Sequence, residues 1–293
     1  MSHCVAEVQA GRTPNPDVLC NSRVKFGAFL EFLENNVAHD FDFIASGHYA
    51  RVEHAGDDAA SRLLPCADAS KDQTYFLSQL RQDQLRRILF PLSHVTKSQV
   101  RTLAASMHIP AATRKDSQGI CFLGKVPWNE FIKEHCGTAP GPIVEQETGD
   151  VLGEHNGVWF HTIGQRRGLK LSGGPWYVVA KDIPNGVVYV SRDYHGDAYK
   201  GTRRTVGMRD ASWLGGETPP DGEVLLKVRH GPERYRAQLT WRDAPECTRG
   251  ELRLLDDVDD QGLAAGQFAV LYHRDAPNTC LGGGVMEAAD APL

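Results

Sequence analysis

The sequence predicts an α/β domain followed by two β-rich domains, and three observations support this prediction. In residues 1–136, short apolar strands alternate with segments of helical periodicity, which is typical of a mainly parallel sheet covered by helices. From Gly137 onward, short strands separated by turns replace the helices. After Lys200 the short strands are evenly spaced, which indicates a small β-barrel. We therefore expect domains at residues 1–136, 137–200 and 201–293, the second small and β-rich.

Three segments of the first domain carry helix signals. Residues 21–37 have apolar side chains close to helical spacing. Residues 70–73, Ser-Lys-Asp-Gln, are typical of a capped helix start. Thr96 is the expected N-cap of a further helix that extends to Met107.

A short apolar strand is expected at residues 41–45, and it stops at Ser46-Gly47-His48. In parallel α/β sheets, ligands bind at the carboxyl ends of strands. Gly47 and His48 are therefore candidates for a ligand site. The alternative is that His48 merely caps the strand.

The second half of the chain contains hairpin signals. Residues 147–150 predict a turn between short strands, and Asn185-Gly186 between apolar runs predicts a β-hairpin formed by residues 176–182 and 187–192. The strands expected in the last domain are residues 223–229, 235–241, 251–255, 268–272 and 281–286.

Composition excludes several classes of protein. No apolar run approaches the length needed to cross a bilayer, and the first residues lack the features of a signal or transit peptide. The formal charge of −5 argues against wholesale nucleic-acid affinity but leaves a clustered basic surface open. The seven cysteines are irregularly spaced and contain no C-x-x-C, which argues against a disulfide framework or a zinc ribbon.

Two cysteines stand in polar, turn-forming settings. Pro14 and Pro16 predict that residues 11–21 form a rigid loop, not a helix, which presents Asn15, Asp17 and Cys20 together. Such a setting can perturb the thiol pKa, which an attacking thiolate requires.

The second cysteine is Cys121, in the sequence Lys-Asp-Ser-Gln-Gly-Ile-Cys-Phe at residues 115–122. Ser117 and Gly119 predict a loop that leads into a short strand at residues 120–123. For the remaining cysteines the preferred interpretation is a small buried hydrophobe or a structural residue, and they are Cys4, Cys66, Cys136, Cys247 and Cys280.

With these motifs the chain resembles the tRNA-specific 2-thiouridylases of bacteria and the mitochondrial tRNA 2-sulfurtransferases. The matching segments follow one another in order along nearly the whole chain: GRTPNPDVLCNSRVKF at 11–26, ASGHYARV at 45–52, SKDQTYFLSQL at 70–80, KDSQGICFLG at 115–124, HTIGQRRGL at 161–169, WYVVAKD at 176–182 and CLGGGV at 280–285.

The resemblance implies a PP-loop ATPase domain, a central β-rich tRNA-binding domain and a C-terminal β-barrel. It implies that ATP, with Mg²⁺, adenylates the C2 oxygen of the wobble uridine, and that a cysteine persulfide then attacks C2. The implied partners are lysine, glutamate and glutamine tRNAs and a sulfur-relay protein or cysteine desulfurase. It also implies a monomer that has no membrane partner and no stably bound metal. Such a protein would be cytoplasmic in a bacterium, and mitochondrial or plastid in a eukaryote.

The resemblance also assigns roles to the two motifs. Cys121 would carry the persulfide and Cys20 would act as the nucleophile. Asp17 would act as acid or base near the uracil ring, and with Asn15 and Pro16 it would line the target-base pocket.

Gly47 would approach the nucleotide, and seven residues would contact tRNA: His48, Lys71, Asp72, Gln73, Arg229, His230 and Gln267. The family usually has an aromatic residue or Tyr at the position of His230. Without the resemblance, Lys71 would be interpreted as part of a solvated helix cap. The basic turn at residues 164–168 is interpreted almost equally well as a charged loop and as an RNA contact.

One family feature has no counterpart in the sequence. Family members begin with a strand and a Ser-Gly-Gly-x-Asp-Ser phosphate loop, and no such loop precedes Gly11. Ser172-Gly173-Gly174 is similar, but Pro175 follows it and cannot donate a backbone N–H to phosphate. Two alternatives to the sulfurtransferase therefore stay open. One is a truncated tRNA-binding product without adenylation, and the weaker one is a thiol-redox protein.

Overall fold

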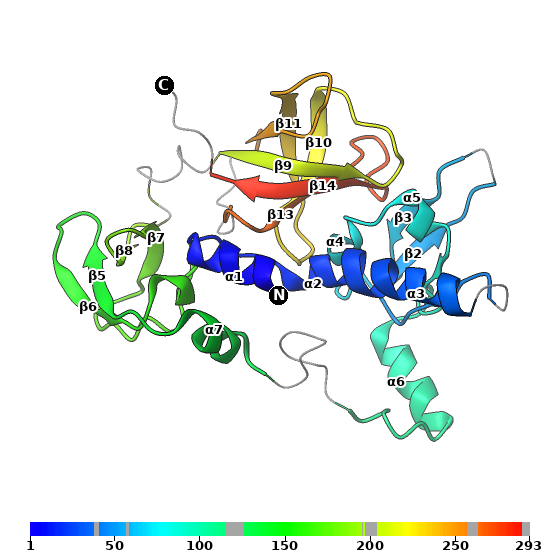
Figure 1. The fold of residues 1–293 in the computed structure, drawn as a ribbon, viewed down its shortest axis with the longest axis horizontal. Coiled ribbons are helices and arrows are strands. Elements are labelled where there is room, and N and C mark those ends of the chain that lie inside the picture. The colour runs from blue at the N-terminus through cyan, green and yellow to red at the C-terminus, as the bar shows by residue number, and fades with distance from the viewer. Residues whose placement is uncertain are drawn as a thin grey trace.

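The computed structural model describes residues 1–37, 41–56, 59–114, 126–194, 196, 204–256 and 263–288 (Figure 1). Its helices are α1 (Ser2–Gln9), α2 (Pro16–Leu19), the π-helix η1 (Cys20–Ala28), α3 (Phe29–Asn36), α4 (Thr74–Leu77), α5 (Gln82–Leu85), α6 (Lys97–Ser106), α7 (Trp128–Cys136) and the 3₁₀ helix η2 (Val158–Phe160). None of these helices combines the length and apolar character that a membrane span requires.

The first motif is helical from Pro16 onward, so the expectation of a rigid loop that extends through Cys20 is wrong. Asn15 is the N-cap of α2, its Oδ1 lying 3.5 Å from the backbone N of Val18, and Pro16 occupies the first turn. Pro is compatible with this position because the first helical N–H groups have no partner within the helix. Cys20 therefore opens η1, which continues directly into α3.

Other helix predictions are confirmed. Residues 21–37 are helical as η1 and α3. Thr96 caps α6, with its Oγ1 accepting from the backbone N of Gln99 at 3.3 Å. The helix expected from residue 70 begins later, at Thr74, with Gln73 as its N-cap.

In the described part of the first domain, β1 (Ile44–Ala45) pairs in parallel with β4 (Ile88–Leu89). The next two strands, β2 (Ala50–Glu53) and β3 (Arg62–Pro65), pair in antiparallel fashion. A connection this short cannot carry a crossover helix, so within the described residues the expected parallel sheet is limited to β1 and β4. Strand β3 instead continues into the C-terminal sheet.

The middle of the chain forms a four-stranded sheet of β5 (Gly141–Glu145), β6 (Val151–His155), β7 (Tyr177–Asp182) and β8 (Val187–Ser191), in the order β6-β5-β8-β7. The predicted hairpins β5–β6 and β7–β8 are both confirmed. The hydrophobic core of this four-stranded sheet includes Ile143, Trp176, Val178, Val188 and Val190.

The C-terminal region is a closed barrel of six antiparallel strands, which confirms the predicted barrel. The strands are β9 (Thr205–Trp213), β10 (Gly222–Lys227), β11 (Tyr235–Trp241), β12 (Gly250–Leu254), β13 (Phe268–Tyr272) and β14 (Cys280–Glu287). Pairing of β13 with β14 closes the barrel. An added Cβ at Gly283 would lie 1.9 Å from the carbonyl oxygen of Ala269, so this closure requires glycine.

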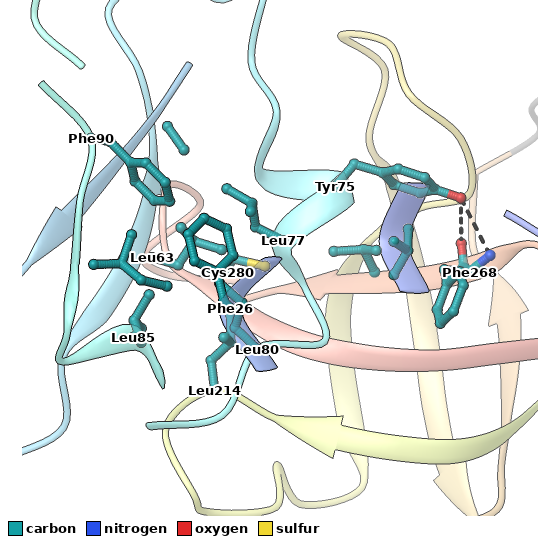
Figure 2. Close-up of a cluster of buried hydrophobic side chains, with 14 of the residues drawn as sticks. Phe26, Leu63, Tyr75, Leu77, Leu80, Leu85, Phe90, Leu214, Phe268 and Cys280 are labelled. Atoms are coloured by element: carbon teal, nitrogen blue, oxygen red, sulfur yellow. Dashed lines mark hydrogen bonds between the residues drawn. The ribbon is translucent and has the colours of Figure 1, made fainter. Parts of the chain in front are cut away.

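The first domain and the barrel share one hydrophobic core (Figure 2). Phe26, Leu77 and Leu85 contribute from the first domain, while Phe268 and Cys280 contribute from barrel strands. Because burial of apolar surface is the main stabilising contribution to folding, these two parts of the chain stabilise each other.

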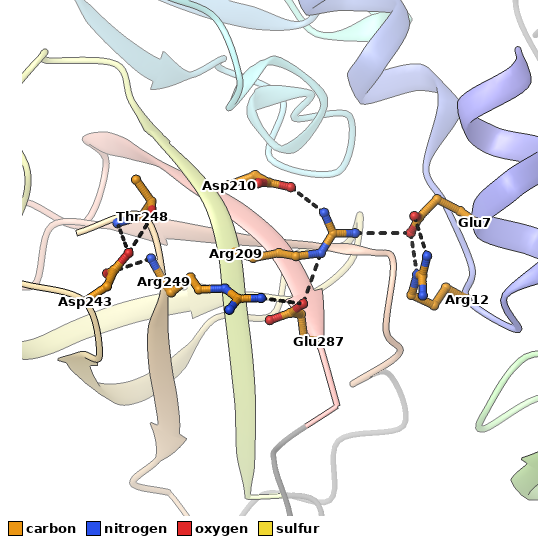
Figure 3. A network of polar contacts seen from close by, with 8 residues as sticks. All are labelled: Glu7, Arg12, Arg209, Asp210, Asp243, Thr248, Arg249 and Glu287. Carbon is orange, nitrogen blue, oxygen red and sulfur yellow. Dashed lines mark hydrogen bonds and ion pairs between the residues drawn. The ribbon is translucent and has the colours of Figure 1, made fainter. Parts of the chain in front are cut away.

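A polar network fixes α1 to the barrel (Figure 3). Glu7 pairs with Arg12 at 2.6 Å and with Arg209 of β9 at 3.3 Å, and Arg209 also contacts Glu287 of β14 at 3.2 Å. The hydrogen bond from Arg12 holds the pKa of Glu7 below its usual value. The network therefore places the segment that follows α1 against the barrel.

Candidate functional site

The segment between α1 and α2 is held from two sides. Lys181 of β7 donates to the carbonyl oxygen of Gly11 at 2.5 Å. On the other side, Gln267 donates to the carbonyl oxygen of Thr13 at 2.8 Å. Gly11 has a φ of +77°, and an added Cβ would lie 2.4 Å from Ile183, so the turn requires glycine. Both β domains therefore shape the start of the first motif.

Asn15 lies against the barrel. Its Nδ2 donates to Oε1 of Gln267 at 3.3 Å, while its Oδ1 caps α2. The backbone N of Thr13 also donates to the carbonyl oxygen of Ala265 at 2.8 Å. Two predicted site residues that are 252 positions apart, Asn15 and Gln267, are thus in direct contact.

Tyr75 joins these residues from α4 and was not among the predicted site residues. Its hydroxyl lies 3.4 Å from Oε1 of Gln267 and 3.2 Å from the carbonyl oxygen of Phe268 (Figure 2). Its side chain is fully buried, and burial raises its pKa well above the usual value, so the hydroxyl stays protonated. Tyr75 belongs to the segment SKDQTYFLSQL, and the resemblance of this segment to the family was the signal that could have identified it as a site residue.

Asp17 and Cys20 follow Asn15 along the same helical path. Asp17 is half-buried in the first turn of α2. Cys20 is 3% exposed and forms no disulfide bond with any described residue. π-Helices are rare and often occur at functional sites, which makes η1 a notable position for this thiol. Attack on a substrate requires the groups that cover Cys20 to move.

Cys121 and the strand expected at residues 120–123 lie outside the described residues. The roles of Cys20 and Cys121 therefore stay predictions. The other thiols are poor nucleophiles at neutral pH because burial raises the pKa of each, and they are Cys4, Cys66, Cys136, Cys247 and Cys280.

Gly47 and His48 follow β1, where the sequence placed them. Gly47 is exposed, and an added Cβ would meet only Leu92, at 3.8 Å, so a ligand can approach the backbone. The ring of His48 packs 5.8 Å from the rings of Phe26 and Phe90, and its Nδ1 lies 2.8 Å from Oγ of Ser46. Burial lowers the pKa of His48 to about 4, so its ring is neutral at pH 7.

The predicted Lys71-Asp72-Gln73 segment lies beside His48. The backbone N of Gln73 donates to the carbonyl oxygen of Tyr49, and its Oε1 accepts from the backbone N of Tyr49, both at 2.8 Å. Asp72, in contrast, is 4% exposed and is not on the surface.

The buried carboxylate of Asp72 forms an ion pair and a hydrogen bond within the protein. Its Oδ2 lies 3.2 Å from Nζ of Lys227, which is 2% exposed, and accepts from Oγ1 of Thr74 at 2.7 Å. The Thr74 hydroxyl lies 2.6 Å from the hydroxyl of Tyr272. This pair joins α4 to β10 and β13, and contact of Asp72 with RNA stays a prediction.

Arg229 and His230 are exposed just after β10. The ring of His230 lies 4.9 Å from the ring of Phe76, whose carbonyl oxygen accepts from Nδ2 of Asn21 at 3.0 Å. The structure therefore brings the first motif, α4, the end of β10 and Gln267 into one continuous region.

Comparisons with known proteins agree with this architecture. Three family profiles match in succession: tRNA methyl transferase HUP domain over residues 1–125, tRNA methyl transferase PRC-barrel domain over residues 129–192 and aminomethyltransferase beta-barrel domain over residues 203–286. A protein of Parabacteroides distasonis named tRNA-specific 2-thiouridylase MnmA is 42% identical, over 98% of this chain and 77% of its own length.

The chain belongs to the tRNA-specific 2-thiouridylase family. A protein of the same name from Porphyromonas gingivalis is 42% identical over 98% of this chain, and one named tRNA-specific 2-thiouridylase MnmA 1 from Bacteroides thetaiotaomicron is 39% identical over 97%; each match covers 77% of the relative's own length. The HUP domain of 2-thiouridylases implies use of ATP. Among the described residues, no cluster of His, Cys, Asp and Glu side chains could hold a metal ion.

Proposed function

We propose that this chain acts as a tRNA-uridine 2-sulfurtransferase that replaces the C2 oxygen of the wobble uridine with sulfur in an ATP-dependent reaction. The observation that carries the proposal is the match to relatives named tRNA-specific 2-thiouridylase over 97–98% of the chain. The contact of Asn15 with Gln267 supports it, because the resemblance assigns both residues to binding of the RNA.

The chemistry divides one difficult substitution into two easier steps. ATP converts the C2 oxygen into an adenylate, with release of pyrophosphate. The terminal sulfur of a Cys121 persulfide forms a bond to C2, and AMP leaves with the oxygen. The Cys20 thiolate then attacks Sγ of Cys121, which breaks the S–S bond to the transferred sulfur. The products are 2-thiouridine and a Cys20–Cys121 disulfide, which an external thiol reduces to complete the cycle.

The described residues supply binding and proton transfer in this scheme. Asn15, Pro16 and Asp17 line the target-base pocket, and the half-buried Asp17 carboxylate exchanges a proton with the uracil ring. Gly47 offers an open backbone position to the nucleotide.

RNA contacts in this proposal come from both domains. Lys71 and Gln73 lie before α4, and His48 follows β1. Arg229, His230 and Gln267 are contributed by the barrel region. Mg²⁺ accompanies ATP, a relay protein or cysteine desulfurase supplies sulfur, and the protein acts as a monomer on lysine, glutamate and glutamine tRNAs.

The test of the function is the appearance of 2-thiouridine in tRNA incubated with the chain, ATP, Mg²⁺ and a sulfur donor, measured by nucleoside mass spectrometry. Formation of 2-thiouridine confined to tRNAs with a wobble uridine supports the proposal. Salt-sensitive tRNA binding without any thiolation would instead favour the tRNA-binding alternative.

The roles of the thiols are tested by locating donor-derived sulfur on the protein. Cys121→Ser should abolish both sulfur loading and thiolation. Cys20→Ser should block thiolation while Cys121 still carries sulfur. Cys280→Ala is the matched control, because Cys280 is a buried barrel thiol whose pKa is raised to about 12. Sulfur found on Cys66 or Cys136 and absent from Cys121 would contradict the assignment.

A further inference from the structure

Three side chains of the central domain contact the segment that precedes the first motif. Lys181 of β7 donates from Nζ to the carbonyl oxygen of Gly11 at 2.5 Å. Ile183 lies so close to Gly11 that an added Cβ would approach it to 2.4 Å. Oγ1 of Thr162 lies 3.2 Å from Oγ1 of Thr13. The thiolation scheme assigns no role to these three side chains, so the contacts require an explanation of their own.

Lys181 is an unusual residue for its position in β7. It is partly buried, and burial lowers the pKa of its ammonium group to about 8, so the group is still mainly charged at pH 7. Among the described residues no carboxylate forms an ion pair with it. Loss of hydration without a counter-ion is destabilising. Groups that lower stability in this way are expected mainly at functional sites.

The Lys181 ammonium joins two domains at one point. Besides Gly11 of the first domain, Nζ donates to the carbonyl oxygen of His161 in the central domain at 2.9 Å. The next residue, Thr162, is itself fixed, because its backbone N donates to Oε1 of Gln165 at 3.0 Å. Hydrogen bonds from a charged donor are stronger than those between neutral groups. Lys181 therefore holds the glycine turn at a defined position against the central domain.

The chain after this turn is stiff, so the position of the turn determines the position of residues 15–17. From the barrel side, Thr13 donates to the carbonyl oxygen of Ala265 and accepts from Gln267, both at 2.8 Å. Pro14 follows with a fixed φ. A shift of the turn is thus passed on to the residues that the resemblance assigns to the target base. Misplacement of catalytic groups by about 1 Å can lower a rate about a hundredfold.

We infer that Lys181 is a positioning residue for thiolation, because its ammonium holds the carbonyl oxygen of Gly11. The position of this carbonyl group in turn determines where residues 15–17 meet the target base. The inference rests on the proposed function and adds the central domain to the parts of the chain that determine its rate.

The experiment measures 2-thiouridine formation by the full chain at several tRNA concentrations, at a temperature at which parent and variants are folded. Lys181→Met should lower kcat by about tenfold or more and leave KM within about twofold of the parent value, because it disturbs the reacting geometry and no RNA contact. Lys181→Arg, which keeps donors for both carbonyl oxygens, should recover part of the rate. Lys133→Met is the matched control, since Lys133 is exposed on α7, and it should leave kcat unchanged.

A second readout does not depend on activity. Hydrogen exchange of the Thr13 amide, which donates to Ala265, should rise in Lys181→Met and stay unchanged in Lys133→Met. Thr162→Val, which keeps the shape of the side chain but removes its hydroxyl, should raise the same exchange to a smaller extent.

The outcomes separate this inference from the proposed function. Absence of 2-thiouridine with the parent chain would contradict the proposed function, whereas unchanged Thr13 exchange in Lys181→Met would overturn the inference even in an active protein. The inference would also be overturned by a kcat equal to that of the parent, by a rise in KM at unchanged kcat, or by an equal loss of kcat in Lys133→Met.

Discussion

The two faces of the first domain differ in how completely they are packed. On the barrel side, Tyr75 is fully buried and Asp72 and Lys227 form an interior ion pair. On the opposite side, α6 contains no buried residue and extends away from the barrel (Figure 1). Leu103 in α6 is 58% exposed, and Phe32 in α3 is 56% exposed. The residues around Asn15 are thus packed from the barrel side, through Gln267.

The largest expected effect comes from breaking the ion pair on the packed face. Lys227→Met leaves the Asp72 carboxylate buried without its cation, which should lower the free energy of unfolding by about 3–5 kcal/mol. Urea unfolding followed by circular dichroism measures this loss. The double variant Asp72→Asn, Lys227→Met should recover much of it, since no buried charge remains. A single variant as stable as the parent protein would show that the pair does not hold the two parts together.

The second prediction concerns pH and the partly buried imidazole of His48. Its folded pKa is about 4 and the usual value is 6.5, so between these values the unfolded chain binds more protons. Stability should therefore fall as pH drops from 6.5 to 4, by up to about 3 kcal/mol from this residue. Comparison of unfolding at pH 7 and pH 5 for the parent and His48→Gln measures the contribution. An unchanged pH dependence in the variant would contradict burial of a neutral ring.

A smaller effect is expected from the contact between the first motif and the barrel. Gln267→Ala removes the hydrogen bonds to Thr13 and Asn15 and should destabilise the fold by about 1–3 kcal/mol. Gln79 offers a matched control, because its amide donates to the carbonyl oxygen of Gly283 and not to Thr13 or Asn15. Hydrogen exchange at Thr13 and Asn15 should rise in Gln267→Ala and stay unchanged in Gln79→Ala. The same exchange in both variants would show that Gln267 does not position the motif.

The smallest effect is expected on the open face. Leu103→Gln and Met107→Gln replace side chains that are 58% and 62% exposed, and each should change unfolding free energy by less than about 0.5 kcal/mol. Thermal unfolding of the two variants checks this. A loss of several kcal/mol would mean that this face is covered in solution, and the comparison between the two faces would then fail.

Local sequence signals predicted much of the fold. The Asn185-Gly186 hairpin and the Thr96 cap are confirmed because each depends on residues that are neighbours in the chain. Strand β9 was not predicted, since Gly207 and Asp210 interrupt its apolar pattern. The helical start at Pro16 was mistaken for a loop because proline is compatible with both.

The site was less accessible to sequence reasoning. Tyr75 and Gln267 are 192 positions apart, and no local pattern indicates that they meet. Burial of Asp72 likewise depends on Lys227, 155 positions away, so the segment around Lys71 reads as a solvated cap from sequence alone. Long-range contacts of this kind follow from the barrel's packing against α4.

The central claim is that the barrel holds residues 14–20 where the wobble uridine binds. The most direct measurement replaces that uridine with 4-thiouridine, irradiates the complex and maps the cross-linked peptide by mass spectrometry. The account predicts a cross-link within residues 14–20 that weakens in Gln267→Ala. A cross-link confined to other segments, or one equally strong from a 4-thiouridine elsewhere in the anticodon loop, would contradict it.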